Sequence, residues 1–338
     1  MIVVTGAFGF IGVYLVDALR EAGIEVLATA RRDEAAGYFA RRGVGFQQLD
    51  VTSEADFEQL PQSDVEGVVH LAGLLPANVR EGRPHDYVSV NVLGTLNVLE
   101  YCRVAGVPRL IATTSYADVQ NAWRASPPVA SDEPRDFKLS GDHAVYVITK
   151  NAATDAILHA STEQGLLGAV FRLPPVYGYG PHLAIYVDGK LYKTGFERFV
   201  EKARKGAPIE VWGDPAAVRD IVYVKDVVQA FAKAIASERA RGVYNISSGR
   251  GITLAEQARA IVEVFSQPDG PRSEIVFRPD KPSGITPYVF DISKPARDFG
   301  YSPDYNFPAM MRDYREEELA GRYDDFIACR QKPAEAVE

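Results

Sequence analysis

Hydrophobic and polar positions in the first half of the chain follow two alternating patterns. Short apolar runs, typical of buried strands, occupy residues 2–5, 24–30, 44–49, 67–73, 109–115 and 168–172. Apolar positions at helical spacing occur between them and after them, over residues 13–22, 91–100 and 146–163. Nearly continuous apolar strands that alternate with amphipathic helices are typical of a parallel sheet covered on both faces. The pattern therefore predicts an α/β fold with a doubly wound parallel sheet.

Three glycines, Gly6, Gly9 and Gly12, separate the first strand from the first helix and enclose Phe10 and Ile11. Glycine lets a backbone turn tightly against a phosphate, and the following helix offers unpaired N–H groups and its positive dipole end. Such a motif alone can also be a simple reversing turn. Its place between a buried strand and a helix favours a pyrophosphate site of a dinucleotide in a Rossmann domain.

The end of the second strand predicts which dinucleotide binds. An acidic residue there would bond the adenosine ribose, whereas arginine would attract a 2′-phosphate. The chain has Ala30 at this position, followed by Arg31, Arg32 and Asp33. This favours NADP, while NAD stays possible because Asp33 could turn inward and the two arginines could form a solvated turn.

Two later strand ends complete the predicted cofactor site. Asp50 and Val51 follow the third strand, where the adenine is expected. Leu71, Ala72 and Gly73 follow the fourth strand, and the small side chains of the last two would let the cofactor pass close to the backbone.

Beyond residue 173 the alternation loosens. Residues 174–181 are irregular and rich in proline, glycine and tyrosine, and the patterns predict helices over 196–204 and 227–236 and a strand over 243–249. We expect a dinucleotide-binding domain of residues 1–173 and 219–248, a smaller, partly discontinuous α/β substrate domain of residues 174–218 and 249–330, and a loose tail of residues 331–338.

Composition narrows the class of protein. The 338 residues are 46% hydrophobic, which supports a large core, and the net charge of −8 offers no basic footprint for nucleic acid or an anionic membrane. Only Cys102 and Cys329 occur, far apart, so we expect neither a disulfide framework nor a metal site. No apolar stretch is long enough to span a membrane, and the strand at residue 2 leaves no room for a signal segment, so we expect a cytoplasmic protein.

Tyr146 and Lys150 are the candidate acid–base pair. Four residues apart on a helix, they share one face. A nearby ammonium favours the phenolate form of a tyrosine and brings its pKa toward neutral pH. Such pairs also occur on solvated helix faces, but here the pair follows five strand–helix units and Ser115, a hydroxyl residue at the end of the fifth strand.

Taken together, these motifs resemble the extended branch of the short-chain dehydrogenase/reductase family. The residues that carry the resemblance are Thr5, Gly6, Gly9, Gly12, Asp50, His70, Gly73, Asn91, Ser115, Tyr146 and Lys150, and later Arg172, Tyr177, Pro181, Asp214, Arg219 and Asp226. The later ones are similar to the nucleotide-sugar epimerase and dehydratase group. The resemblance implies a nicotinamide cofactor, contacted also by Asn91, Tyr146 and Lys150, and a homodimer packed through the helices around residues 91–102 and 146–163.

The resemblance also implies roles for individual residues. Ser115 would bond the reacting sugar oxygen, Tyr146 would take or return its proton, and Arg219 would hold the diphosphate of the sugar nucleotide. A surface Arg219–Asp220 pair is the alternative. Pro175 replaces a common asparagine and indicates an altered substrate pose. His182 could contact substrate or be an exposed loop histidine.

One departure from the family bears on the reaction. Dehydratases of this group carry an Asp-Glu pair directly after the catalytic hydroxyl residue, and here Tyr116 and Ala117 occupy those positions, which disfavours dehydration. We therefore expect a nucleotide-sugar epimerase with transient hydride transfer. The alternatives are an NADP-dependent ketoreductase or dehydrogenase of a keto-sugar or small polyol, and a cofactor-sensing protein without turnover, which the intact Ser115, Tyr146 and Lys150 argue against.

Overall fold

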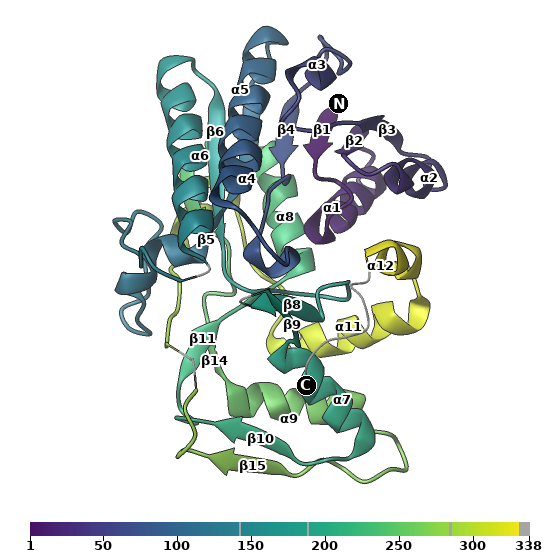
Figure 1. The fold of residues 1–338 in the computed structure, drawn as a ribbon, viewed down its shortest axis with the longest axis vertical. Helices are drawn as coiled ribbons and strands as arrows, with labels where there is room; N and C mark the ends of the chain where they lie inside the picture. Colours follow the sequence, from purple (N-terminus) through teal and green to yellow (C-terminus); the bar gives the residue numbers. More distant parts are fainter. Residues whose placement is uncertain (142, 188, 284–285, 331–338) are drawn as a thin grey trace.

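The computed structural model describes residues 1–141, 143–187, 189–283 and 286–330, so the predicted tail of residues 331–338 lies outside the described part. A seven-stranded sheet organises the larger part of the molecule (Figure 1). In spatial order its strands are β13 (Gly242–Asn245), β6 (Leu167–Leu173), β5 (Arg109–Ser115), β4 (Gly67–His70), β1 (Ile2–Thr5), β2 (Val26–Ala30) and β3 (Gly45–Gln48). Every neighbouring pair is parallel, which confirms the predicted doubly wound α/β fold.

Two helical layers cover this sheet, as Figure 1 shows. Helices α1 (Phe10–Glu21) and α8 (Val224–Ile235) share one core with it, and α5 (Gly94–Val104) and α6 (Ala144–Glu163) share the other. Side chains along β1 alternate between the two cores: Ile2 and Val4 pack toward α1 and α8, whereas Val3 packs toward α5 and α6. Burial on both faces explains why the strand reads as one apolar run.

The order of strands reverses at β1, which lies between β2 and β4. In doubly wound sheets ligands bind outside the carboxyl ends of the strands at such a reversal. The topology therefore directs attention to the segments that follow β1, β2 and β4.

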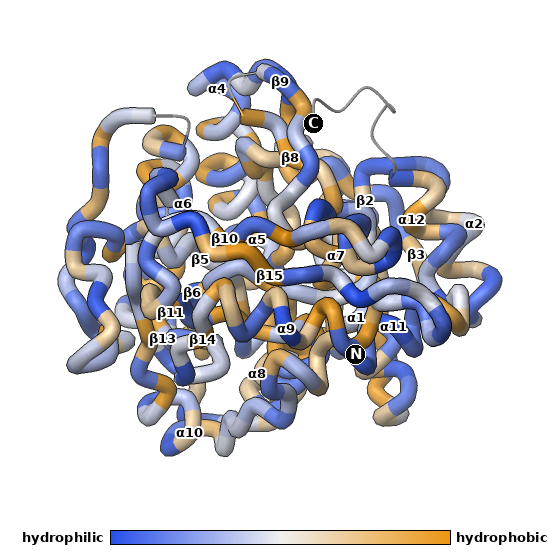
Figure 2. The backbone as a smooth tube through the Cα atoms, turned by 90° about the horizontal axis from the view of Figure 1, so that it is seen from below, coloured by the Kyte–Doolittle hydropathy of each residue, from blue (hydrophilic) through white to orange (hydrophobic). Residues whose placement is uncertain are grey.

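A smaller part of the molecule lies below the sheet in Figure 1. It holds α7 (Gly195–Lys205), α9 (Leu254–Phe265), the antiparallel pair β8 (Ala184–Val187) and β9 (Lys190–Lys193), and the parallel pair β10 (Ile209–Trp212) and β15 (Ile275–Arg278). In Figure 2 blue and orange alternate along α9, as in a helix with one face on a core. A capping box starts this helix, with Thr253 and Glu256 satisfying each other's backbone N–H groups.

Shorter elements connect these parts. They are α2 (Glu34–Ala40), α3 (Glu54–Phe57), η1 (Pro76–Asn78), α4 (Pro84–Tyr87), η2 (Val88–Leu93), η3 (Tyr116–Ala122), β7 (Val176–Tyr177), β11 (Val218–Asp220), β12 (Val222–Tyr223), β14 (Gly251–Thr253) and α10 (Ser293–Phe299). Within the described ranges, no helix has both the length and the apolar character needed to cross a bilayer.

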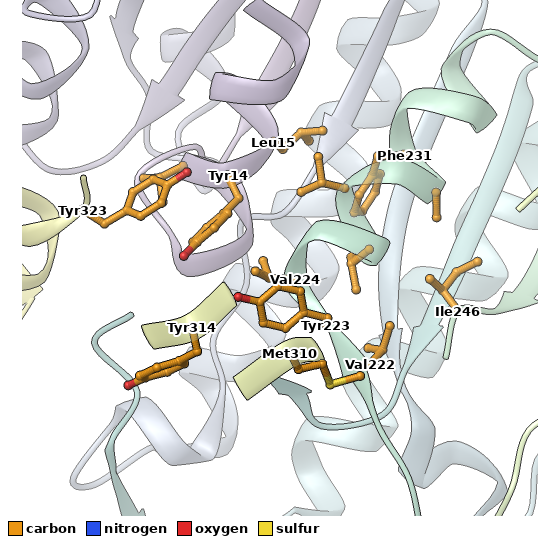
Figure 3. Close-up of a cluster of buried hydrophobic side chains, with 14 of the residues drawn as sticks. Tyr14, Leu15, Val222, Tyr223, Val224, Phe231, Ile246, Met310, Tyr314 and Tyr323 are labelled. Carbon is orange, nitrogen blue, oxygen red and sulfur yellow. The ribbon is translucent and has the colours of Figure 1, made fainter. Parts of the chain in front are cut away.

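The C-terminal helices α11 (Phe307–Ala320) and α12 (Asp324–Arg330) return to the sheet domain. In Figure 3 Tyr14 of α1 faces Tyr323, and their rings stack at 4.1 Å. Met310 of α11 lies in the same cluster beside Tyr223. The expected domain division, which groups residues 249–330 with the substrate domain, stays a prediction, but α12 contacts α2 of the dinucleotide-binding part.

Candidate active site

A cavity of about 190 Å³ lies at the reversal of strand order. Nine residues that the sequence predicts for the cofactor line it: Gly6, Gly9, Arg31, Arg32, Asp50, Val51, Leu71, Ala72 and Gly73. Phe8, Ala30, Leu49, Leu74, Val90 and Arg330 line it too. We call it the cofactor-side cavity. Its lining comes from the segments that follow β1, β2, β3 and β4, and from the end of α12.

The glycine turn fits a closely approaching ligand. Gly6 has φ +67°, and a Cβ atom added there would lie 2.5 Å from the backbone nitrogen of Ala72. A Cβ on Gly12 would lie 2.5 Å from the carbonyl oxygen of Ala7. Gly9 is the N-cap of α1, and no side chain caps that helix end. The unpaired N–H groups of a helix start are therefore available to an anion such as a pyrophosphate.

The other residues predicted for the cofactor lie around this cavity rather than in its lining. Phe10 and Ile11 pack against the large core that includes α1, and Gly12 supports the turn. Asn91 lies in the π-helix η2, where its Oδ1 accepts from the Leu74 N–H (2.8 Å) and its Nδ2 donates to Thr149 Oγ1 (3.1 Å). Asn91 thus joins the loop after β4 to α6, so its role is structural in the geometry seen here.

Asp33, the acidic residue that could turn toward the adenosine ribose, makes its hydrogen bond elsewhere. Asp33 accepts a hydrogen bond from Gln48 Nε2 at 2.6 Å, and the same amide donates to the Arg31 carbonyl oxygen. Asp50 accepts from the N–H and hydroxyl of Thr52. The arginines Arg31 and Arg32 face the cavity without either carboxylate as an ion-pair partner.

Ser115, Tyr146 and Lys150 come from two adjacent elements. Ser115 ends β5 and caps η3, its Oγ accepting from the Ala117 N–H at 3.2 Å. Tyr146 and Lys150 lie one turn apart near the start of α6, which packs on β5. Tyr116, next to Ser115, is close enough to Tyr146 to shift its pKa. Ser115 therefore lies at the carboxyl end of β5, and Tyr146 and Lys150 lie on the helix that packs against this strand.

Burial controls the protonation of this group. It raises the pKa of Tyr146 above its ordinary value, and the hydroxyls of Tyr116 and Tyr87 raise it further. It also lowers the pKa of Lys150 from 10.5 to about 8. The lowering of the Tyr146 pKa by Lys150 that the sequence predicts does not appear in this structure, because desolvation dominates both groups.

His70, at the end of β4, lies near Lys150 and is held in place through both ring nitrogens. Its Nδ1 lies 2.7 Å from Thr5 Oγ1 and its Nε2 lies 3.2 Å from Thr95 Oγ1. Burial lowers its pKa to about 3, and the positive charge of Lys150 lowers it as well. A neutral histidine held on both ring nitrogens is a positioning element that ties β1 and β4 to α5.

A second cavity, of about 1100 Å³, opens toward the smaller part of the molecule. We call it the substrate-side cavity. Of the four residues predicted for substrate, Pro175, His182 and Arg219 line it, whereas Ser115 does not. The centroid of the His182 ring lies 4.2 Å from that of Phe10, the first residue of the helix that follows the glycine turn. Pro175 has no backbone N–H, and its carbonyl oxygen accepts a hydrogen bond from the Val222 N–H.

Arg219 is one of five basic residues in the lining of this cavity, with Lys193, Arg198, Lys202 and Lys205. Its Nη2 is 3.4 Å from the hydroxyl of Tyr177, and its buried Nε has no hydrogen-bond partner. Burial lowers its pKa, but the neighbouring hydroxyls of Tyr177, Tyr288 and Tyr116 outweigh that effect and the pKa is raised. A guanidinium with a free donor among tyrosines suits an anionic ligand. The alternative of an Arg219–Asp220 pair is not found, because Asp220 accepts instead from Ser248, Gly249 and Phe290.

Sequence reasoning missed an aromatic cluster between the catalytic residues and Arg219. Tyr116 stacks on Trp123 at 5.0 Å, and Tyr288 lies 5.4 Å from Tyr116 and 4.8 Å from Trp123. Tyr288 is brought in through bridges from Arg219 to Tyr288 and from Val129 to Phe290. Nothing local in the sequence marks Tyr288, although Tyr116 adjoins Ser115 and could have been found from that position.

The comparisons with known proteins agree with this geometry. Residues 2–247 match the NAD dependent epimerase/dehydratase family. A dTDP-4-dehydro-6-deoxy-D-allose reductase of a Streptomyces species is 28% identical over 315 residues, covering 89% of this chain and 91% of the relative.

Two solved structures are similar over nearly the whole chain. The UDP-glucose 4-epimerase of Thermotoga maritima with UDP-glucose is 25% identical, with a TM-score of 0.75, over 94% of this chain and 98% of that one. The UDP-glucose 4-epimerase of Thermus thermophilus in complex with NAD is 26% identical, with a TM-score of 0.70, over 93% and 97%. The resemblance found from the sequence is thereby confirmed: the chain belongs to the NAD dependent epimerase/dehydratase family, whose members here are NAD-dependent enzymes of the extended short-chain dehydrogenase/reductase group.

Proposed function

We propose that this protein is a nucleotide-sugar epimerase-type oxidoreductase. The observation that carries the proposal is that Tyr116, which directly follows Ser115, raises the pKa values of both Tyr146 and Arg219. A ligand with a sugar at Tyr146 and a diphosphate at Arg219 would run along this aromatic cluster into the substrate-side cavity. The similar Thermotoga maritima enzyme is described with UDP-glucose.

The residues of the chain divide the work as follows. Ser115 offers its hydroxyl to the reacting sugar oxygen, and Tyr146 takes that oxygen's proton or returns it. Lys150 offers a charge that is easily lost, because burial lowers its pKa to about 8. A bound nicotinamide dinucleotide supplies an acceptor and donor of hydride. Because Tyr116 and Ala117 replace the acid pair of dehydratases, no described carboxylate directly follows Ser115 to eliminate water.

A ketoreductase is the second candidate, and two observations favour it. The related Streptomyces protein is named as a reductase. Reductases that consume their cofactor commonly use NADP, and Arg31 and Arg32 line the ribose end of the cofactor-side cavity. We propose NADP as the cofactor on this ground, since Asp33 is bonded to Gln48.

We also propose a homodimer. Apolar side chains are exposed on the outer layer formed by η2, α5 and α6, namely Leu93, Leu96, Val104 and Ile148. Such a patch on two adjacent helices suits an isologous helix-to-helix interface. The cytoplasmic location expected from the sequence stays a prediction.

The functions are separated by one assay. The purified protein is offered UDP-, GDP-, dTDP- and CDP-sugars while absorbance of reduced nicotinamide and sugar stereochemistry are both followed. Inverted product without added cofactor supports the epimerase. Stoichiometric consumption of cofactor supports the reductase, and inertness in both readouts supports a protein that senses cofactor without turnover.

A further inference from the structure

The cofactor-side cavity contains an arginine from the far end of the chain. Arg330, the last residue of α12, lines it together with Arg31 and Arg32, which follow β2. In the part of the chain that the structure describes, none of these three guanidinium groups forms an ion pair, although most other arginines near α12 do. Three guanidinium groups that have no ion-pair partner among the described residues therefore line the cavity beside the end of β2.

The helix that carries Arg330 is fixed to the glycine turn. The ring of Phe326 lies 5.3 Å from Phe8, which belongs to that turn, and 6.2 Å from Tyr38 of α2. Asp325 pairs with Arg41 Nη2 at 3.1 Å, and Asp324 accepts from the hydroxyl of Tyr179 at 2.8 Å. Arg330 is therefore held at the cavity by contacts to the elements that form it.

The positively charged surroundings of Arg330 favour a negatively charged ligand. Burial lowers its pKa, and the positive charges of Arg32 and Arg31 lower it further. Three carboxylates on the neighbouring segments are engaged elsewhere: Asp33 by Gln48, Asp50 by Thr52 and Asp325 by Arg41. Converging like charges without a carboxylate destabilise one another, and a bound dianion would offset that repulsion.

We propose that Arg330 completes a three-arginine site for the 2′-phosphate of the cofactor, so that the C-terminal helix α12 helps to select NADP over NAD. The inference rests on the proposed use of NADP. A phosphate monoester has three oxygens for which guanidinium forks from two sides of the cavity can each donate charge-assisted hydrogen bonds.

The test is equilibrium binding to the apoprotein, measured by titration calorimetry with NADP, NAD, 2′,5′-ADP, 5′-ADP and inorganic phosphate. Arg330→Ala should weaken NADP and 2′,5′-ADP by about ten-fold or more, the effect of losing a charged hydrogen-bond donor. NAD and 5′-ADP should change by less than about two-fold. Arg31→Ala should act in the same direction. Arg312→Ala, an exposed arginine on α11, is the matched control and should change none of the affinities.

The outcomes separate the two proposals. If the wild-type protein binds NAD as tightly as NADP, the proposed cofactor is wrong and the inference falls with it. If wild type prefers NADP but Arg330→Ala keeps that preference, only the role of Arg330 is overturned. Thermal unfolding of each variant without ligand shows whether α12 still docks. An Arg330→Lys variant, which keeps the charge, should retain part of the preference, and equal loss in the Lys and Ala variants would point to packing instead.

Discussion

The two cavities of this protein are built in opposite ways. The cofactor-side cavity is formed mainly by short segments that directly follow strands β1 to β4, all within the first 90 residues except for Arg330. The substrate-side cavity draws on residues from Pro175 to Ser283, which lie on strands, helices and loops of both parts of the molecule. The first is a property of local motifs on a regular sheet, and the second is a property of tertiary folding.

Tyr146 lies near the start of α6, outside the lining of both cavities. Tyr146→Phe removes the hydroxyl that exchanges the proton and leaves both cavities intact, so turnover should fall by about 10²- to 10⁴-fold while ligand binding persists. Steady-state kinetics with cofactor titration checks this. Tyr101→Phe on α5 is the control, because the Tyr101 hydroxyl donates to the Pro61 carbonyl oxygen, away from the site. Undiminished activity in the Tyr146 variant would remove this residue from the mechanism.

Burial of the Lys150 ammonium should lower the free energy of unfolding of the apoprotein at neutral pH. Its pKa is about 8 in the fold and 10.5 ordinarily, so between these pH values the unfolded chain binds a proton that the folded chain does not. Stability therefore rises with pH across that window, by up to about 3 kcal/mol. Lys150→Met should be more stable than wild type at pH 7, and the difference should shrink as pH rises from 8 toward 10.5. Denaturant unfolding at several pH values measures it, and a constant difference would show that the ammonium is not the cause.

The glycine turn offers a test of the cofactor-side cavity with an internal control. Gly6 and Gly23 both have positive φ, but a Cβ on Gly6 would meet Ala72 at 2.5 Å, whereas a Cβ on Gly23 has no atom within 4 Å. Gly6→Ala should cost about 1–3 kcal/mol of stability and weaken cofactor binding. Gly23→Ala should cost about 1 kcal/mol and leave binding unchanged. Equal effects of the two substitutions on binding would mean that the close approach at Gly6 is unimportant.

A substitution at Arg219 tests whether the substrate-side cavity binds the nucleotide sugar. Arg219→Met keeps the length of the side chain and removes the donors, so KM for the nucleotide sugar should rise by about ten- to one hundred-fold, as for a lost charged hydrogen bond. The affinity for the dinucleotide should not change. Arg250→Met, at an exposed arginine, serves as the comparison. A fall in kcat with no change in KM would place Arg219 with the reacting atoms instead of the diphosphate.

These contrasts explain what could be predicted from the sequence. The parallel sheet and the residues of the glycine turn were predictable because burial on both faces and φ restrictions act over a few neighbouring residues. Tyr288 and Arg330 were not, since each reaches its site through contacts between segments that are far apart in the chain. The effect of Lys150 on Tyr146 was also misjudged, because spacing on a helix gives proximity and does not give the degree of burial.

The proposed inversion of a sugar carbon with no net redox change can be followed by running the reaction in heavy water. A nucleotide sugar that the enzyme converts is incubated in D₂O without added cofactor, and the product is examined by NMR at the inverted carbon. If the protein is an epimerase, we expect inverted product that keeps its original hydrogen at that carbon. Only the proton on the sugar oxygen exchanges through Tyr146. Deuterium at the inverted carbon, or product that forms only as NADPH is consumed, would contradict it.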